Sequence, residues 1–99
     1  MKQHNIINQI LGAVSATSGI PLDAIRGTGR TRSLVYARYI IVAMLKEKCP
    51  WLSLSELAAA IGRTDHGSAS HALGQARSLP YRDKAFNALL QSSQQRAAA

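Results

Sequence analysis

The chain is poor in cysteine, in aromatic residues and in long apolar stretches. Cys49 is the single cysteine among 99 residues, which excludes an internal disulfide framework. The longest strongly apolar run covers residues 39–45 and is far shorter than the roughly 20 residues that cross a bilayer. The first residues are polar and lack the apolar core of a signal peptide. We therefore expect a soluble, cytoplasmic protein without a membrane partner.

Acidic residues are also scarce. The chain has 5 Asp and Glu against 12 Lys and Arg, which gives a formal net charge of +7 and an isoelectric point of about 10.4. Such an excess on a short chain favours an anionic partner, and nucleic acid is the first candidate. A membrane surface is less suitable, because no basic amphipathic helix with aromatic anchors is present.

Groups that could support catalysis or hold a metal ion are few. His66 and His71 are five residues apart, which separates them by about 140° around a helix and suits one metal ion poorly. No pair of carboxylates is recognisable among five acids. The chain has no Walker A sequence for a nucleotide. We therefore expect a protein that is not an enzyme, with no catalytic residues, metal, cofactor or bound nucleotide.

Apolar residues recur at helical spacing through most of the chain, which predicts a compact, all-α, multi-helix domain. The first helix, with its apolar residues over positions 6–14, should end near Gly19, and a single helical turn should follow Pro21. The longest helix should cover residues 33–48 and form the centre of the core. Pro50 stops it, and Trp51 and Leu52 should then pack on the core.

Residues 53–79 predict two helices joined by a tight turn. Ser53 and Glu56 have the spacing of a capping box at the start of the first helix. Gly62 can end that helix in the left-handed conformation, and Asp65 can cap the second one, which covers about residues 66–78. The stretch therefore has the pattern of a helix-turn-helix.

The second of these helices has one apolar stripe, made of Ala69, Ala72, Leu73 and Ala76. Its opposite side carries small or polar residues, which suits the major groove of DNA. An ordinary solvated surface helix is the alternative. Pro80 should end the pattern, and a last helix should run from Tyr81 to about Leu90. We expect residues 1–91 to form a single domain and residues 92–99 a flexible tail.

A basic loop covers residues 26–33 and contains Arg30 and Arg32 between glycines and hydroxyl residues. Arginines in such a loop can enter a narrow minor groove, where the negative potential is high. A solvated connector is the alternative, although Arg38 and Lys46 extend the basic series outside the apolar stripe of the next helix.

These motifs together resemble the C-terminal DNA-binding domain, domain IV, of the bacterial replication initiator DnaA. The resemblance covers roughly residues 5–90. It rests on residues 30–38 (RTRSLVYAR), 52–57 (LSLSEL) and 61–66 (IGRTDH) and on their order along the chain. It implies a fold of the Trp-repressor type with a helix-turn-helix, in the form of a free-standing DnaA-like protein.

The resemblance also implies roles for individual residues. Arg30 matches the basic-loop arginine that enters the minor groove, and Arg38 and Lys46 match cations that contact phosphates. Asp65 and His66 match the pair that reads bases in the major groove.

Further matches extend the same surface. Ser68 and His71 match positions that touch the DNA backbone, and Ser55 matches one that approaches a base. The chain departs from the family pattern at Thr64, which stands between Arg63 and Asp65, and at Gly67, where the family has a hydroxyl residue. Either Arg63 takes over the family arginine's role through a small shift of the turn, or that base contact is absent.

We therefore expect sequence-specific binding to double-stranded DNA. The protein would be associated with a replication origin or would have a regulatory role. It would act in the nucleoid and have no ATPase activity. A transcription regulator unrelated to replication and a small helical protein-interaction module are the alternatives. For the latter, Trp51, Tyr36, Tyr39 and Tyr81 could form a surface for a protein partner or a dimer.

Overall fold

The computed structural model describes residues 2–98, which form six α-helices without a strand in that part of the chain. The helices are α1 (Lys2–Ser18), α2 (Leu22–Ile25), α3 (Arg32–Lys48), α4 (Leu54–Ala60), α5 (His66–Arg82) and α6 (Lys84–Ala98). The predicted all-α fold is confirmed. Within residues 2–98, no helix is both long enough and apolar enough to cross a membrane.

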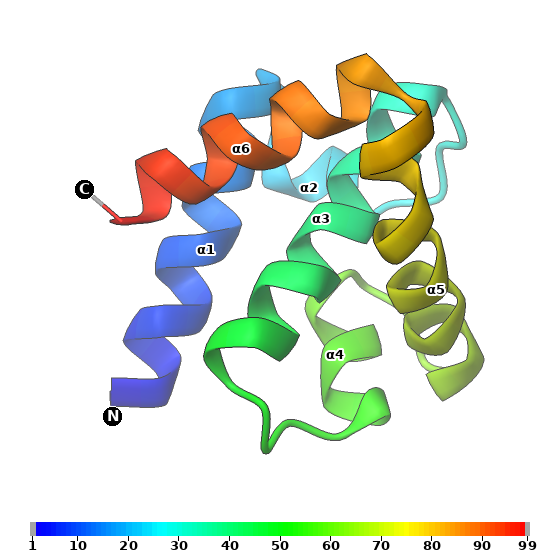
Figure 1. Ribbon diagram of the computed structural model, residues 1–99. Coiled ribbons are helices and arrows are strands. Elements are labelled where there is room, and N and C mark those ends of the chain that lie inside the picture. Colours follow the sequence, from blue (N-terminus) through cyan, green and yellow to red (C-terminus); the bar gives the residue numbers. More distant parts are fainter. Residues whose placement is uncertain (1, 99) are drawn as a thin grey trace.

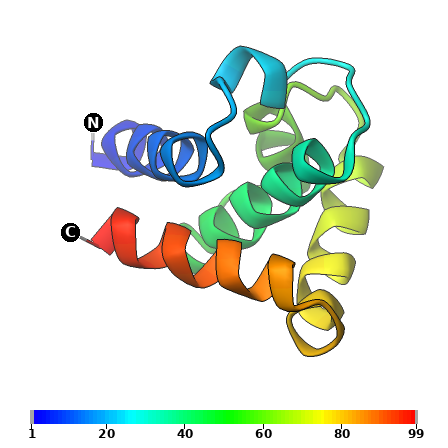
Figure 2. The same cartoon turned by 90° about the horizontal axis from the view of Figure 1, so that it is seen from above.

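Helix α3 lies at the centre and packs against α1, α4 and α5. Its buried side chains include Ile40, Ile41, Val42 and Leu45. Removing one such side chain from water stabilises a fold by roughly 1.5–3 kcal/mol. Helix α6 crosses above α3 and reaches α1, while α4 and α5 lie together on the other side (Figures 1 and 2).

The helix ends follow the predicted local signals. Ser53 and Glu56 form the capping box of α4, in which each side chain accepts from the other residue's backbone N–H. Gly19 and Gly62 have φ angles of +73° and +76°, the left-handed region that glycine enters without steric cost. These ends fix where α1 stops and where the turn between α4 and α5 begins.

Pro80 does not end α5, contrary to the sequence prediction. It lies inside the helix, which continues to Arg82. A proline in a helix removes one N–H donor and crowds the preceding turn, but the neighbouring Leu79 is 4% exposed and anchors this segment in the core. The break falls instead at Asp83, whose carboxylate accepts from the N–H of Phe86 at 3.0 Å and so starts α6.

Two further expectations differ from the structure. Trp51 is 61% exposed, and only Leu52 beside it enters the core. Residues 92–98, expected as a frayed tail, continue α6 along α1, and Ser93 is fully buried. Two hydrogen bonds join these helices: Arg96 Nε donates to Thr17 Oγ1 at 3.0 Å and Gln9 Nε2 donates to the Ala97 carbonyl at 2.9 Å. Ala99 lies outside the described residues.

Candidate nucleic-acid interface

The start of α5 is set by Asp65, as the sequence predicted. Its carboxylate accepts from the backbone N–H of Ser68 at 3.0 Å and from the Ser68 hydroxyl at 2.9 Å. The Ser68 hydroxyl bond is the main reason that the pKa of Asp65 lies below its ordinary value. Asp65 is therefore charged at neutral pH and holds the first turn of α5, while the Ser68 hydroxyl is turned toward it.

The two sides of α5 differ in the way that the apolar stripe predicted. Ala69 and Ala72 are buried against the rest of the molecule. The outer side consists of small or polar residues that are all exposed: His66, Gly67, Ser70, His71, Gly74 and Ser78. With so little side-chain bulk, the backbone of α5 can approach a groove floor closely.

The basic loop lies directly against the turn of the helix-turn-helix. Arg26 donates to the Ala59 carbonyl at 3.2 Å, and Arg63 NH1 donates to the Gly27 carbonyl at 3.0 Å. A Cβ atom on Gly62 would overlap with the carbonyl of Arg26, so the two segments touch through their backbones. Loop and turn therefore form one continuous surface.

Arg38 is placed differently from the role that the resemblance implied. It is 5% exposed and lies beneath the basic loop instead of facing outward. Nε donates to the Ile25 carbonyl and NH1 to the Gly29 carbonyl, each at 2.6 Å, and NH2 donates to the Gly27 carbonyl at 3.1 Å. Burial, followed by the charges of Arg63 and Arg30, lowers the pKa of Arg38 below its ordinary value. The amphipathic pattern missed this, because an arginine can enter a core when backbone carbonyls surround it.

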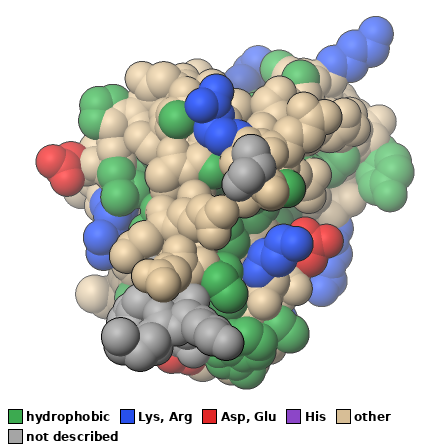
Figure 3. Space-filling view, turned by 90° about the vertical axis from the view of Figure 1, so that its left-hand side faces the viewer, with side chains coloured by type: hydrophobic (Ala, Val, Ile, Leu, Met, Phe, Trp, Pro, Cys, Tyr) green, Lys and Arg blue, Asp and Glu red, His purple; other side chains and the backbone are tan. Residues whose placement is uncertain are grey.

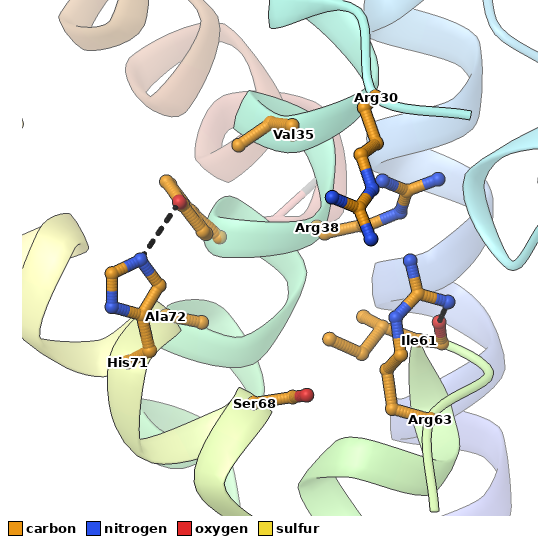
Figure 4. A pocket seen from close by; sticks show the side chains of 9 residues that line it. Arg30, Val35, Arg38, Ile61, Arg63, Ser68, His71 and Ala72 are labelled. Atoms are coloured by element: carbon orange, nitrogen blue, oxygen red, sulfur yellow. Dashed lines mark hydrogen bonds between the residues drawn. The ribbon is translucent and has the colours of Figure 1, made fainter. Parts of the chain in front are cut away.

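A pocket of about 490 Å³ opens between the basic loop, α3 and α5. The guanidinium groups of Arg30, Arg38 and Arg63 gather on one side of it, and His71 borders the other (Figure 4). Tyr39 Oη and His71 Nε2 are 3.2 Å apart and within hydrogen-bond distance. The pocket is thus lined by guanidinium groups at one wall and by the imidazole and hydroxyl of His71 and Tyr39 at the other, and the guanidinium wall suits an anionic ligand.

A second hollow connects Arg30 to the start of α5. It is lined by Thr28, Arg30, Gly62, Arg63, Thr64 and Asp65. Thr64 is exposed in the turn between α4 and α5. The structure therefore brings Arg30 of the basic loop, Arg63 and Thr64 of the turn, and the α5 cap Asp65 to one place.

The other predicted site residues are more widely spread. Lys46 is exposed near the end of α3, donates to the Pro50 carbonyl at 3.0 Å and borders a hollow with Arg77. Arg32 begins α3, and its charge acts on Asp83 at the α5–α6 junction. Ser55 is exposed in the first turn of α4. None of these three residues lines the pocket.

Sequence reasoning missed two contributors to the site. The spacing of Tyr39 indicates a core residue, yet its hydroxyl reaches His71 on α5. Arg26 has no feature that separates it from the rest of the basic loop, yet it fixes the end of α4. Neither contact has a local sequence signal, since each joins residues more than 30 positions apart.

The model of the family described as bacterial dnaA protein helix-turn-helix matches residues 7–75, which run from within α1 to the middle of α5. The search of the curated proteins and the search of the solved structures find no significant match. Across the described part of the chain, no three His, Cys, Asp or Glu residues lie close enough together to hold a metal ion.

Proposed function

Because the chain belongs to the family of bacterial DnaA helix-turn-helix domains, we propose that it binds double-stranded DNA sequence-specifically through two grooves at once. Family membership supports DNA binding in general. In this proposal the first turns of α5 enter the major groove and Arg30 enters the adjacent minor groove. The observation that carries it is the contact between the basic loop and the turn before α5, which presents both readers on one surface.

The base-reading residues are assigned from their exposure and position. His66 is exposed in the first turn of α5, and Asp65 and Thr64 precede it along the hollow that leads from Arg30. In helix-turn-helix proteins, residues at the start of the recognition helix contact base edges. Ser55 of α4 lies at the other end of the same motif and approaches the DNA from there.

Phosphate contacts are assigned to the surrounding groups. The cations are exposed or half-buried: Arg32, Lys46, Arg63 and Arg77. His71 adds an imidazole beside Tyr39, and Ser68, in the first turn of α5, is assigned a further contact to the DNA backbone. Such contacts orient a protein on the duplex and carry no sequence information themselves.

The process that this binding serves is proposed to be replication-origin-associated or regulatory. The chain has no Walker A sequence, so the proposed activity is binding without ATP hydrolysis. A transcription regulator is the second candidate, because site-specific binding by a small helix-turn-helix protein can also block a promoter. A map of bound sites across a bacterial chromosome would separate the two, by origin-proximal against promoter-proximal positions.

A binding titration with a short duplex at several salt concentrations tests the proposal. About five cationic contacts, Arg30 included, should give a slope of log affinity against log salt near −4 to −5. Lys46→Gln should reduce the slope by about one. The matched control is Arg96→Gln, on the far end of α6 beside Thr17, which should leave the slope unchanged. A slope near zero would favour a protein-interaction module instead.

A further inference from the structure

Arg38 lies beneath the basic loop and donates to its backbone carbonyls. We infer that Arg38 is a positioning residue that fixes the loop in its DNA-binding shape, acts through Arg30 and makes no phosphate contact of its own. This inference rests on the proposed function, because it explains how two groove-reading elements keep a constant spacing. It departs from the role that the family resemblance implied for this position.

The hydrogen bonds of Arg38 show how the loop is held. Its three nitrogens donate to four backbone carbonyls, those of Ala24, Ile25, Gly27 and Gly29. A guanidinium has five N–H donors in a planar fork, so at most one is left for any other acceptor. The last of these carbonyls precedes Arg30 directly in the chain, which fixes the point from which the Arg30 side chain leaves the loop.

The same loop is tied to the reading helix. Arg63 donates to the Gly27 carbonyl, which also accepts from Arg38. Arg38 and Arg63 therefore hold one carbonyl from opposite elements, α3 and the turn before α5. The distance from Arg30 to the start of α5 is thereby set before DNA arrives, so less conformational entropy is lost on binding.

A lysine could not replace this arginine. Its ammonium is a single donor centre on a flexible stem, whereas the observed carbonyls surround a planar fork. A phosphate contact, in contrast, depends mainly on charge and is served by either residue. Arg38→Lys therefore separates positioning from direct contact, and Arg38→Met removes the charge while keeping much of the apolar stem.

The experiment is a double-mutant cycle on a duplex selected from a random library, at fixed salt. Arg38→Met and Arg38→Lys should each weaken binding roughly tenfold, as the loss of one groove contact does. In an Arg30→Ala background, either change should have almost no further effect. As the matched control, Arg77→Gln should weaken binding by the same factor with or without Arg30. Additive losses from Arg38 and Arg30, or restored affinity in Arg38→Lys, would overturn the inference.

A second measurement needs neither DNA nor a variant. Backbone ¹⁵N relaxation of the free wild-type protein should give residues 27–31 order parameters close to the rigid value of about 0.85. Values below roughly 0.6 would show a mobile loop and overturn the inference even if DNA binds. A rigid loop in a protein that binds no duplex would leave the holding role of Arg38 intact and contradict only the proposed function.

Discussion

Gly62 is the residue at which the two DNA-facing segments come closest. Its φ of +76° is unfavourable for any residue with a side chain, and a Cβ atom would overlap with the Arg26 carbonyl. Both constraints arise from the same turn, which must reverse the chain after α4 while lying against the basic loop. The glycine at position 62 is therefore needed both for the turn after α4 and for the close spacing of the basic loop and the start of α5.

Gly62→Ala should therefore lower the free energy of unfolding by more than about 1 kcal/mol. The matched control is Gly12→Ala. Gly12 lies in the middle of α1 and is exposed, and an added Cβ there would meet nothing within 4 Å outside the helix's own backbone. That change should raise stability by about 0.5–1 kcal/mol. Urea denaturation of both variants checks the pair, and equal midpoints would contradict the strained turn.

At the start of α5, substitutions of Asp65 and His66 can distinguish helix capping from base reading. Asp65→Asn keeps an N-cap residue of similar quality but replaces a pure acceptor by a mixed donor and acceptor, so it should fold normally and shift the preferred base. His66→Ala should weaken binding to the preferred duplex roughly tenfold and binding to random duplexes little. Affinities for the preferred and the random duplexes, measured at one salt concentration, give the ratio of specific to non-specific affinity for each variant. If neither variant changes that ratio, both residues are structural.

Among the elements, the junction of α5 and α6 is held to α3 by a hydrogen bond and a ring contact. The Tyr36 hydroxyl on α3 donates to the Asp83 carboxylate, and the Tyr36 and Phe86 rings meet edge to face with centroids 5.1 Å apart. The Tyr36 bond, followed by the Phe86 N–H, lowers the pKa of Asp83 below its ordinary value. The same bond raises the pKa of Tyr36. The charged carboxylate therefore joins three helices.

This junction predicts a pH dependence. Because the pKa of Asp83 is lower in the folded state, its contribution to stability is present above the unfolded pKa of about 3.9 and is lost as pH falls through the folded value. Tyr36→Phe removes the hydrogen bond that is the main cause of the lowered pKa of Asp83. The stability gap between wild type and this variant should be full at pH 7 and shrink below pH 4. Urea midpoints from pH 7 to pH 2 measure it, and a gap independent of pH would contradict the link.

Helix α6 carries one group that the core does not satisfy. Ser93 is fully buried, and its hydroxyl has no hydrogen-bond partner in the described part of the chain. Ser93→Ala should therefore raise the free energy of unfolding by about 1 kcal/mol, because it removes an unsatisfied buried group. The exposed neighbour provides the control, since Ser92→Ala should change stability by less than about 0.5 kcal/mol. A destabilised Ser93→Ala would show that the hydroxyl has a partner in solution.

The sequence predicted those elements whose signals are local. The capping box at Ser53, the cap at Asp65 and the glycine at position 62 each act within a few residues, so their spacing was sufficient. Pro80 and Arg38 escape such reasoning for a common cause. The continuation of α5 past Pro80 depends on packing around Leu79, and the burial of Arg38 depends on carbonyls of α2 and of the basic loop, nine to fourteen residues away. Neither the continuation of α5 nor the burial of Arg38 can be predicted from the sequence of one helix alone.

At the scale of the whole molecule, the α1 side and the α5 side differ in how their basic side chains are distributed. The face that carries α1 and the end of α6, opposite α5, shows scattered Lys and Arg side chains, with acidic side chains among them (Figure 3). The Arg30, Arg38 and Arg63 cluster belongs to the other side, around the start of α5. Helix α6 lies outside the matched family region but seals the core through Phe86, which is fully buried.

Selection of bound duplexes from a random library tests the two-groove proposal most directly. The wild-type protein should enrich a short core sequence, read by α5, with A·T pairs on one flank, where a narrow minor groove accepts Arg30. Arg30→Ala should enrich the same core without the flank. A recovered pool as varied as the starting library would contradict sequence-specific binding, and a flank that persists in Arg30→Ala would place that arginine on a phosphate.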